Sequence, residues 1–121
     1  KIIIFTPTPE LQDARLRRCK GQNTQWFSKL GQKNCYVDLE KLNSKNGFYY
    51  GLIQKLKKLD EEVNNIFLFD SLETMCESSK CNYKVGNNLL YRDDNHISDY
   101  AAKHIIAPAL IRFLNEKQIL N

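Results

Sequence analysis

The chain has 121 residues, of which 42% are hydrophobic and 26% are charged, a composition that fits a globular domain and excludes a disordered or fibrous chain. Its net charge of +4 combines 18 basic with 14 acidic residues. The basic cluster at residues 55–58 is followed directly by acidic residues at 60–62. We therefore expect a solvated helix face and no nucleic-acid partner. No apolar stretch approaches the ~20 residues that cross a bilayer, and no signal peptide is present, so any such segment is expected elsewhere in the precursor.

Two short apolar runs, at residues 2–5 and 66–69, predict parallel strands that are buried on both faces. The first run opens the sequence without an initiator Met, so we expect its neighbours in the sheet to come partly from sequence before residue 1. Residues 6–10 contain two prolines, which stop ladder pairing and predict a loop at the end of the strand. Such loops line the ligand crevice in open parallel sheets.

The clearest helix is predicted from Phe48 to about Val63, where apolar residues recur at intervals of three and four. Before it, residues 11–18 fit a short helix or an irregular segment, and residues 22–34 fit a helix with Thr24 as its N-cap. Residues 35–39 fit a short strand or an extended connection.

The C-terminal third is predicted to form a hairpin, a polar loop and a helix. Residues 83–91 suggest a hairpin that turns at residues 86–88, and Ser98 is a plausible cap for a helix from Asp99 to about Asn115. Pro108 should kink this helix. The order of elements is typical of the tail of a doubly wound α/β layer.

Four cysteines suggest disulfide bonds in an oxidising compartment. Cys76 and Cys81 enclose four residues, and Cys19 and Cys35 flank a polar segment, so local pairing is the simplest of three connectivities. Zinc is the alternative, but neither spacing is the close CxxC pair of a zinc ribbon and the two histidines lack finger spacing. We therefore favour two disulfides and expect no metal.

The most informative segment for chemistry is the sequence Asp93-Asp94-Asn95-His96. A catalytic histidine needs a carboxylate that fixes its tautomer and orientation, and an Asp three residues earlier in a turn can supply it. By spacing alone, the segment fits a polar surface loop better than a catalytic pair. Asp94 is expected to face solvent, while Tyr91 and Arg92 are candidates for substrate contact, with packing and surface charge as the alternatives.

Several motifs of the chain resemble the SGNH hydrolase superfamily, specifically the extracytoplasmic SGNH domain fused behind membrane acyltransferases that O-acylate bacterial surface glycans. The matching pieces are the strand at 2–5 with Pro9-Glu10, Arg18-Cys19, the strand at 66–69 with Asp70, Cys76 with Cys81, and above all the block at 90–98. The resemblance implies that Asp93 and His96 belong to a Ser-His-Asp triad. It also implies a three-layer α/β/α flavodoxin-like fold and no metal or organic cofactor.

The same resemblance implies that the nucleophile lies outside these residues. The family's Gly-Asp-Ser block, and the Gly and Asn of its oxyanion hole, precede the first strand seen here, and no serine present has a nucleophile's setting. We therefore expect residues 1–121 to be the C-terminal part of a single SGNH domain, without its nucleophile-bearing N-terminal part. The isolated chain is expected to be inactive.

The function implied is O-acyl transfer, with acetyl the expected group, to hydroxyls of a bacterial surface polysaccharide. An upstream membrane acyltransferase domain would deliver the acyl donor, and the protein would lie in the periplasm, tethered to the inner membrane. Two alternatives remain open. One is a secreted carbohydrate esterase with the same triad, and the other is a noncatalytic, disulfide-bonded glycan-binding or assembly module.

Overall fold

The computed structural model describes residues 1–10, 36–42, 44 and 48–120. Its elements are β1 (Ile2–Phe5), β2 (Tyr36–Asp38), α2 (Leu39–Leu42), α3 (Phe48–Glu62), β3 (Ile66–Phe69), α4 (Ser71–Met75), β4 (Lys80–Asn82), β5 (Lys84–Val85), β6 (Asn88–Leu89), α5 (Asp99–Ala101), a π-helical segment (Ala102–Ile106) and α6 (Ala107–Glu116). The helices expected at residues 11–18 and 22–34 lie outside the described residues, as does the pairing of Cys19 with Cys35.

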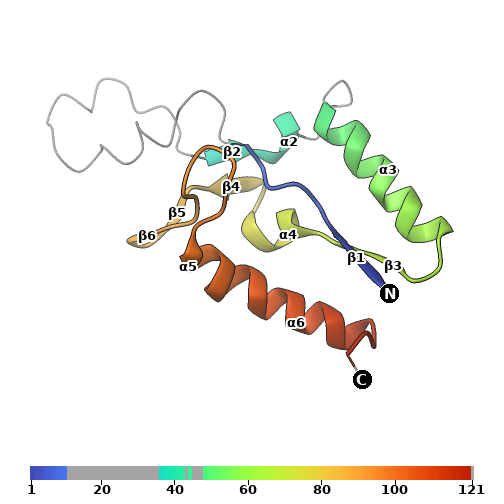
Figure 1. The fold of residues 1–121 in the computed structure, drawn as a ribbon. Coiled ribbons are helices and arrows are strands. Elements are labelled where there is room, and N and C mark those ends of the chain that lie inside the picture. The colour runs from blue at the N-terminus through green and yellow to red at the C-terminus, as the bar shows by residue number, and fades with distance from the viewer. Residues whose placement is uncertain (11–35, 43, 45–47, 121) are drawn as a thin grey trace, which may run out of the picture.

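The centre of the fold is the parallel pair formed by β1 and β3, as the two apolar runs predict. The register joins Ile2 to Ile66 and Phe5 to Phe69. The chain between the two strands includes α3, so the three elements form the βαβ unit of an α/β fold. Figure 1 shows the strand pair lying between α3 and α6. The rings of Phe69 and Phe113 meet edge to face at 5.4 Å, which joins β3 to α6.

The two outer edges of this strand pair differ. On β1, Ile2 and Phe5 are 59% and 46% exposed, so the prediction that this strand is buried on both faces is wrong for the described residues. No described strand pairs with the outer edge of β1. On β3, the outward N–H of Leu68 donates to Oδ1 of Asp60 at 2.8 Å. A side chain from α3 therefore closes the edge of β3, while the edge of β1 stays open.

The carboxyl ends of the two strands are joined by a buried polar network that the sequence analysis did not predict. The backbone N–H of Ser71 donates to Oγ1 of Thr6 at 2.9 Å, and its hydroxyl donates to the carbonyl of Thr6 at 2.8 Å. Asp70 caps α4 by accepting from the N–H of Leu72 at 2.9 Å, and Oγ1 of Thr6 donates to the same carboxylate oxygen at 3.2 Å. Thr6 and Ser71 are both buried, so the network fixes the position of α4.

Two small antiparallel pairs complete the described sheet structure. β2 pairs with β4, with Val37 opposite Cys81, and β5 pairs with β6 in the hairpin that the sequence predicts. Gly86, at the hairpin turn, has a φ of 56°, a conformation that costs glycine little. The predicted disulfide between Cys76 and Cys81 is present and links the end of α4 to β4.

The last helix runs from Asp99 to Glu116, and its cap is the predicted one, because Oγ of Ser98 accepts from the N–H of Ala101 at 3.1 Å. Its interior includes a π-helical turn immediately before Pro108. The N–H of Ala107 bonds to the carbonyl of Ala102, five residues earlier. A proline has no N–H and its ring collides with the carbonyl four residues before it, so a wider turn accommodates Pro108.

We predict that replacing both Cys76 and Cys81 by alanine lowers the free energy of unfolding by about 2 kcal/mol, because the bridge closes a short loop and short loops lose the least entropy in the unfolded chain. Urea denaturation of the two proteins measures this difference. Alkylation followed by intact mass verifies that the bridge is formed in the unreduced wild type. Equal unfolding midpoints would show that the bridge contributes nothing to stability.

Candidate functional site

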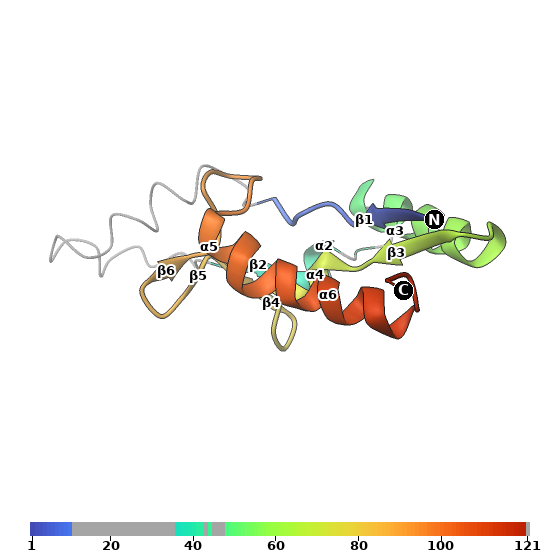
Figure 2. The ribbon, with the colours of Figure 1, turned by 60° about the horizontal axis from the view of Figure 1, so that its bottom comes forward.

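The segment from Arg92 to Ile97 is a loop closed at its base by backbone pairing. Tyr91 and Ile97 form an antiparallel bridge, and the N–H of Arg92 donates to the carbonyl of His96 at 2.9 Å. Leu90 and Tyr91, which precede the loop, are 1% and 0% exposed. Figures 1 and 2 both place the loop beside the segment that follows β1. Buried neighbours therefore hold an exposed loop in a fixed position next to a strand end.

The predicted partners Asp93 and His96 are hydrogen-bonded inside this loop. Nδ1 of His96 lies 2.8 Å from Oδ1 and 3.0 Å from Oδ2 of Asp93. With Nδ1–H donating to the carboxylate, the neutral ring carries its free lone pair on Nε2. The imidazole side chain is 63% exposed.

The Asp93 carboxylate also organises the backbone of the loop. Its Oδ1 accepts from the N–H of His96 at 2.8 Å and from the N–H of Asn95 at 3.2 Å, the pattern of an Asx turn. The backbone bond from His96 is the largest influence that lowers the pKa of Asp93 to about 2, with smaller contributions from the N–H of Asn95 and the imidazole of His96. Asp93 is therefore ionised at neutral pH.

The neighbours of this pair take different positions. Asp94 is exposed and has no hydrogen bond or ion pair within the described residues. The Nε of Arg92 lies 3.7 Å from Oδ2 of Asp93, and its side chain is 71% exposed. Tyr91 is fully buried, and burial raises the pKa of its phenol, which favours packing over the substrate contact that the sequence also allowed. Its hydroxyl has no hydrogen-bond partner among the described residues.

No serine in the described part of the chain hydrogen-bonds to the ring of His96. The Ser71 hydroxyl donates to the carbonyl of Thr6. The Ser98 hydroxyl donates to the carbonyl of Leu89 at 2.6 Å and also caps α5. Ser78 and Ser79 occupy turn positions with positive φ. The positions of these four serines agree with the expectation that they are structural, whereas Ser28 lies outside the described residues.

Sequence reasoning missed the polar contacts that lie at the ends of the two strands. The hydroxyl of Tyr49, at the start of α3, donates to the carbonyl of Pro7 at 2.8 Å. Burial and the charge of Asp70 both raise the pKa of Tyr49. The available signal was that Thr6 and Asp70 each follow a predicted parallel strand directly, and the carboxyl ends of parallel strands meet at one edge of a sheet.

The chain as a whole matches a known protein family. The family "SGNH domain (fused to AT3 domains)" matches residues 1–110, and the chain belongs to that family. The membership implies the SGNH type of α/β fold and an activity of the esterase or acyltransferase type. No curated protein and no solved structure gives a significant match.

The family's fusion to AT3 membrane acyltransferase domains suggests a membrane-associated protein. Within the described ranges, no helix combines the length and the apolar character needed to span a bilayer.

We predict that the Asp93 carboxyl titrates with a midpoint near pH 2. Because this pKa is lower than the ordinary value of about 3.9, the ionised carboxylate stabilises the folded state above about pH 4, and this contribution is lost as the pH falls toward 2. The pH dependence of the carboxyl ¹³C shift measures the midpoint, and the Asp93→Asn variant assigns the signal.

The His96→Ala variant tests the cause of this depressed pKa. It removes the imidazole but keeps both backbone N–H donors, so most of the lowering should persist. A return of the midpoint to the ordinary value in this variant would show that the imidazole, and not the backbone of the loop, depresses the pKa.

We also predict opposite effects for two tyrosine substitutions. Tyr91→Phe removes a buried hydroxyl that no described residue pairs with, so it should leave the free energy of unfolding unchanged or raise it by up to about 1 kcal/mol. Tyr49→Phe removes the hydrogen bond to Pro7 and should cost about 1 kcal/mol. Urea denaturation compares the two variants. Loss of stability in Tyr91→Phe equal to that in Tyr49→Phe would reveal a partner for the Tyr91 hydroxyl.

Proposed function

We propose that His96 is the general base of a serine-type acyl transfer and that Asp93 orients it. The observation that supports this most directly is the bond between Nδ1 of His96 and the ionised Asp93 carboxylate, with the imidazole otherwise exposed. This is the arrangement in which a histidine can take a proton through Nε2 while the carboxylate stabilises the imidazolium that forms.

The proposed reaction has two half-steps. A serine hydroxyl loses its proton to Nε2 of His96 as the oxygen attacks the acyl carbonyl, and the imidazolium returns that proton to the departing alkoxide, which leaves an acyl-serine. An acceptor hydroxyl then loses its proton to Nε2 and attacks the acyl-serine, and the proton passes back to the serine oxygen as it leaves. Asp93 stays ionised throughout, consistent with its low pKa.

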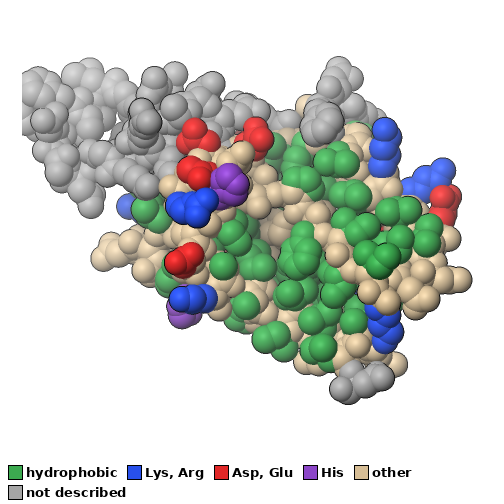
Figure 3. All heavy atoms as spheres, viewed as in Figure 1, with side chains coloured by type: hydrophobic (Ala, Val, Ile, Leu, Met, Phe, Trp, Pro, Cys, Tyr) green, Lys and Arg blue, Asp and Glu red, His purple; other side chains and the backbone are tan. Residues whose placement is uncertain are grey.

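The serine is proposed to come from a part of the polypeptide outside residues 1–121. The open, apolar edge of β1 supports this, because a further strand can pair there, whereas Asp60 closes the edge of β3. Figure 3 shows hydrophobic side chains gathered over β1, α3 and the last helix, where a further layer could pack. Residues 1–121 would then be the C-terminal part of a three-layer α/β/α, flavodoxin-like SGNH domain.

The proposed substrates are a short acyl group, with acetyl the first candidate, and a hydroxyl of a bacterial surface polysaccharide. The AT3 fusion of the family supports delivery of the acyl donor by a membrane domain. The disulfide between Cys76 and Cys81 supports an oxidising compartment such as the periplasm. Together they favour a domain tethered at the outer face of the inner membrane.

We predict that Asp93→Asn lowers turnover in the full-length protein by up to about 10⁴-fold, because the carboxylate no longer fixes the tautomer of His96. His96→Ala should abolish transfer. Asp94→Asn is the matched control, since it makes the same chemical change one residue away on an exposed side chain, and should retain activity. Acetyl content of the surface polysaccharide and hydrolysis of p-nitrophenyl acetate are the two readouts.

The outcomes separate the alternatives. Ester hydrolysis without transfer to polysaccharide would indicate a carbohydrate esterase. Full activity of the full-length protein in both His96→Ala and Asp93→Asn would indicate that residues 1–121 form a noncatalytic module. Specific fluorophosphonate labelling of a serine within residues 1–121 would refute the proposal that the nucleophile lies elsewhere.

A further inference from the structure

A groove with a volume of about 610 Å³ runs between α4 and α6, along β3. This volume lies within the range of roughly 300–1,000 Å³ that is usual for small-molecule sites. Neither Asp93 nor His96 lines it. Leu68 and Phe69, successive residues whose side chains point to opposite faces of β3, both contribute to its wall. No described residue of β1 lines the groove, which lies on the β3 side of the strand pair.

The floor of the groove is apolar and comes largely from the last helix. Ile105, Pro108 and Phe113 lie there, and the packing of Phe113 on Phe69 holds the helix against β3. Such a surface can receive a flat C–H face of a ligand.

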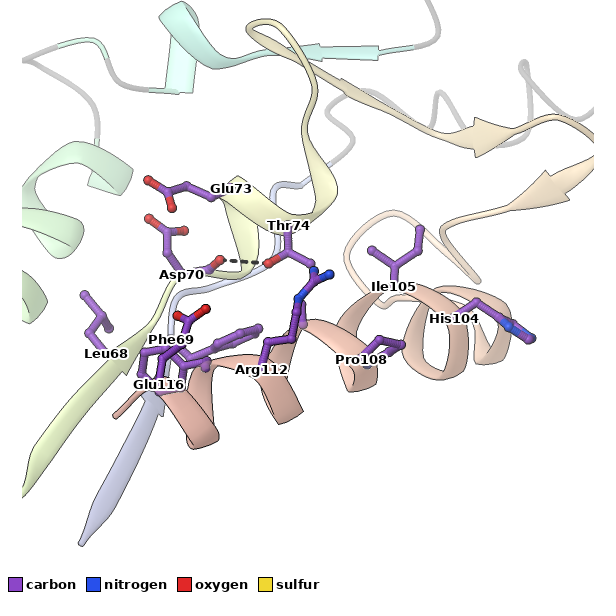
Figure 4. Close-up of a pocket in the computed structure, with 12 residues that line it drawn as sticks. Leu68, Phe69, Asp70, Glu73, Thr74, His104, Ile105, Pro108, Arg112 and Glu116 are labelled. Atoms are coloured by element: carbon purple, nitrogen blue, oxygen red, sulfur yellow. Dashed lines mark hydrogen bonds between the residues drawn. The ribbon is translucent and has the colours of Figure 1, made fainter. Parts of the chain in front are cut away.

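The polar groups around the floor carry both signs of charge and are not paired with one another. Glu73 and Glu116 supply carboxylates, Arg112 supplies a guanidinium and His104 an imidazole, whereas the Asp70 carboxylate belongs to the network with Thr6 and Leu72. Figure 4 shows these side chains around the groove, with the hydroxyl of Thr74 bonded to the carbonyl of Asp70 at 3.2 Å. Glu73, Glu116 and Arg112 take part in no ion pair or hydrogen bond with the described residues. Their hydrogen-bonding capacity is free for a ligand.

This lining discriminates among ligand classes. The two carboxylates of Glu73 and Glu116 outnumber the one guanidinium and disfavour a polyanion, although the whole chain has a net charge of +4. The guanidinium and the apolar floor disfavour a small cation, and the described residues include no cluster of side chains suited to hold a metal ion. A sugar hydroxyl both donates and accepts, so it matches carboxylates and guanidinium together, and the C–H face of a pyranose matches the floor.

We propose that this groove is a second, noncatalytic binding site for a neutral sugar chain. The choice of ligand rests on the proposed function, in which the acceptor is a polysaccharide. A polymer held beside α6 would remain at the domain while one of its hydroxyls reacts at His96. The site would raise the effective concentration of the acceptor without touching the reacting atoms.

The test is a titration of the purified protein with the neutral trisaccharides cellotriose, maltotriose and chitotriose, followed by ¹⁵N chemical shifts. We expect saturable shifts at Thr74, Arg112 and Glu116. The double variant Glu73→Gln, Arg112→Gln should bind at least about tenfold more weakly, because hydrogen bonds to charged groups contribute more than neutral ones. Glu61→Gln is the control, since it neutralises an exposed carboxylate on α3 outside the groove.

Three results would overturn the inference. These are no shift with any of the three sugars at millimolar concentration, shifts confined to residues 92–97, or a response to spermidine but not to the sugars. The readout is binding and needs no turnover, so a protein inactive as an acyltransferase can still show the site. Conversely, an active enzyme without sugar binding in the groove would refute this inference and leave the proposed function intact.

Discussion

The hydrogen bonds between Thr6 and Ser71 are the interactions on which the described structure depends. Parallel strands have no hairpin to hold their ends together, so β1 and β3 need a separate link where they stop. The two hydroxyls, with the Asp70 carboxylate, provide this link in a buried setting, where a missing partner would leave polar groups unsatisfied at considerable cost. It also starts α4, whose far end carries the disulfide to β4.

The Asp93 loop shows how a short polar segment becomes ordered enough for chemistry. One carboxylate accepts two backbone N–H groups and the imidazole, so the turn and the orientation of His96 share a single cause. The loop is exposed, yet Leu90 and Tyr91 fix its stem in the core. A rigid stem below a solvent-facing histidine is compatible with a partner group that approaches from another part of the protein.

Sequence reasoning succeeded where the physical signal is local. Apolar runs located β1 and β3, and three-four spacing located α3. The pairing of Asp93 with His96 was predicted from the family resemblance, because the spacing of the two residues alone also fits a surface loop. It failed for α2, α4 and β4, which are short and depend on contacts with distant segments. β4 exists through its pairing with β2 across more than forty residues of chain. The groove could not be predicted either, because α4, β3 and α6 meet only in the folded protein.

The hydrogen bond from Leu68 to Asp60 has a consequence for self-association. A sheet with two free edges can add copies at both and grow into an open fibre, whereas a sheet with one free edge is exhausted after a single addition. Because the carboxylate occupies the edge of β3, two copies that met through their β1 strands would form a dimer in which this described strand pair offers no free edge to a third copy. One acidic side chain on α3 thus limits how far aggregation through this sheet can proceed.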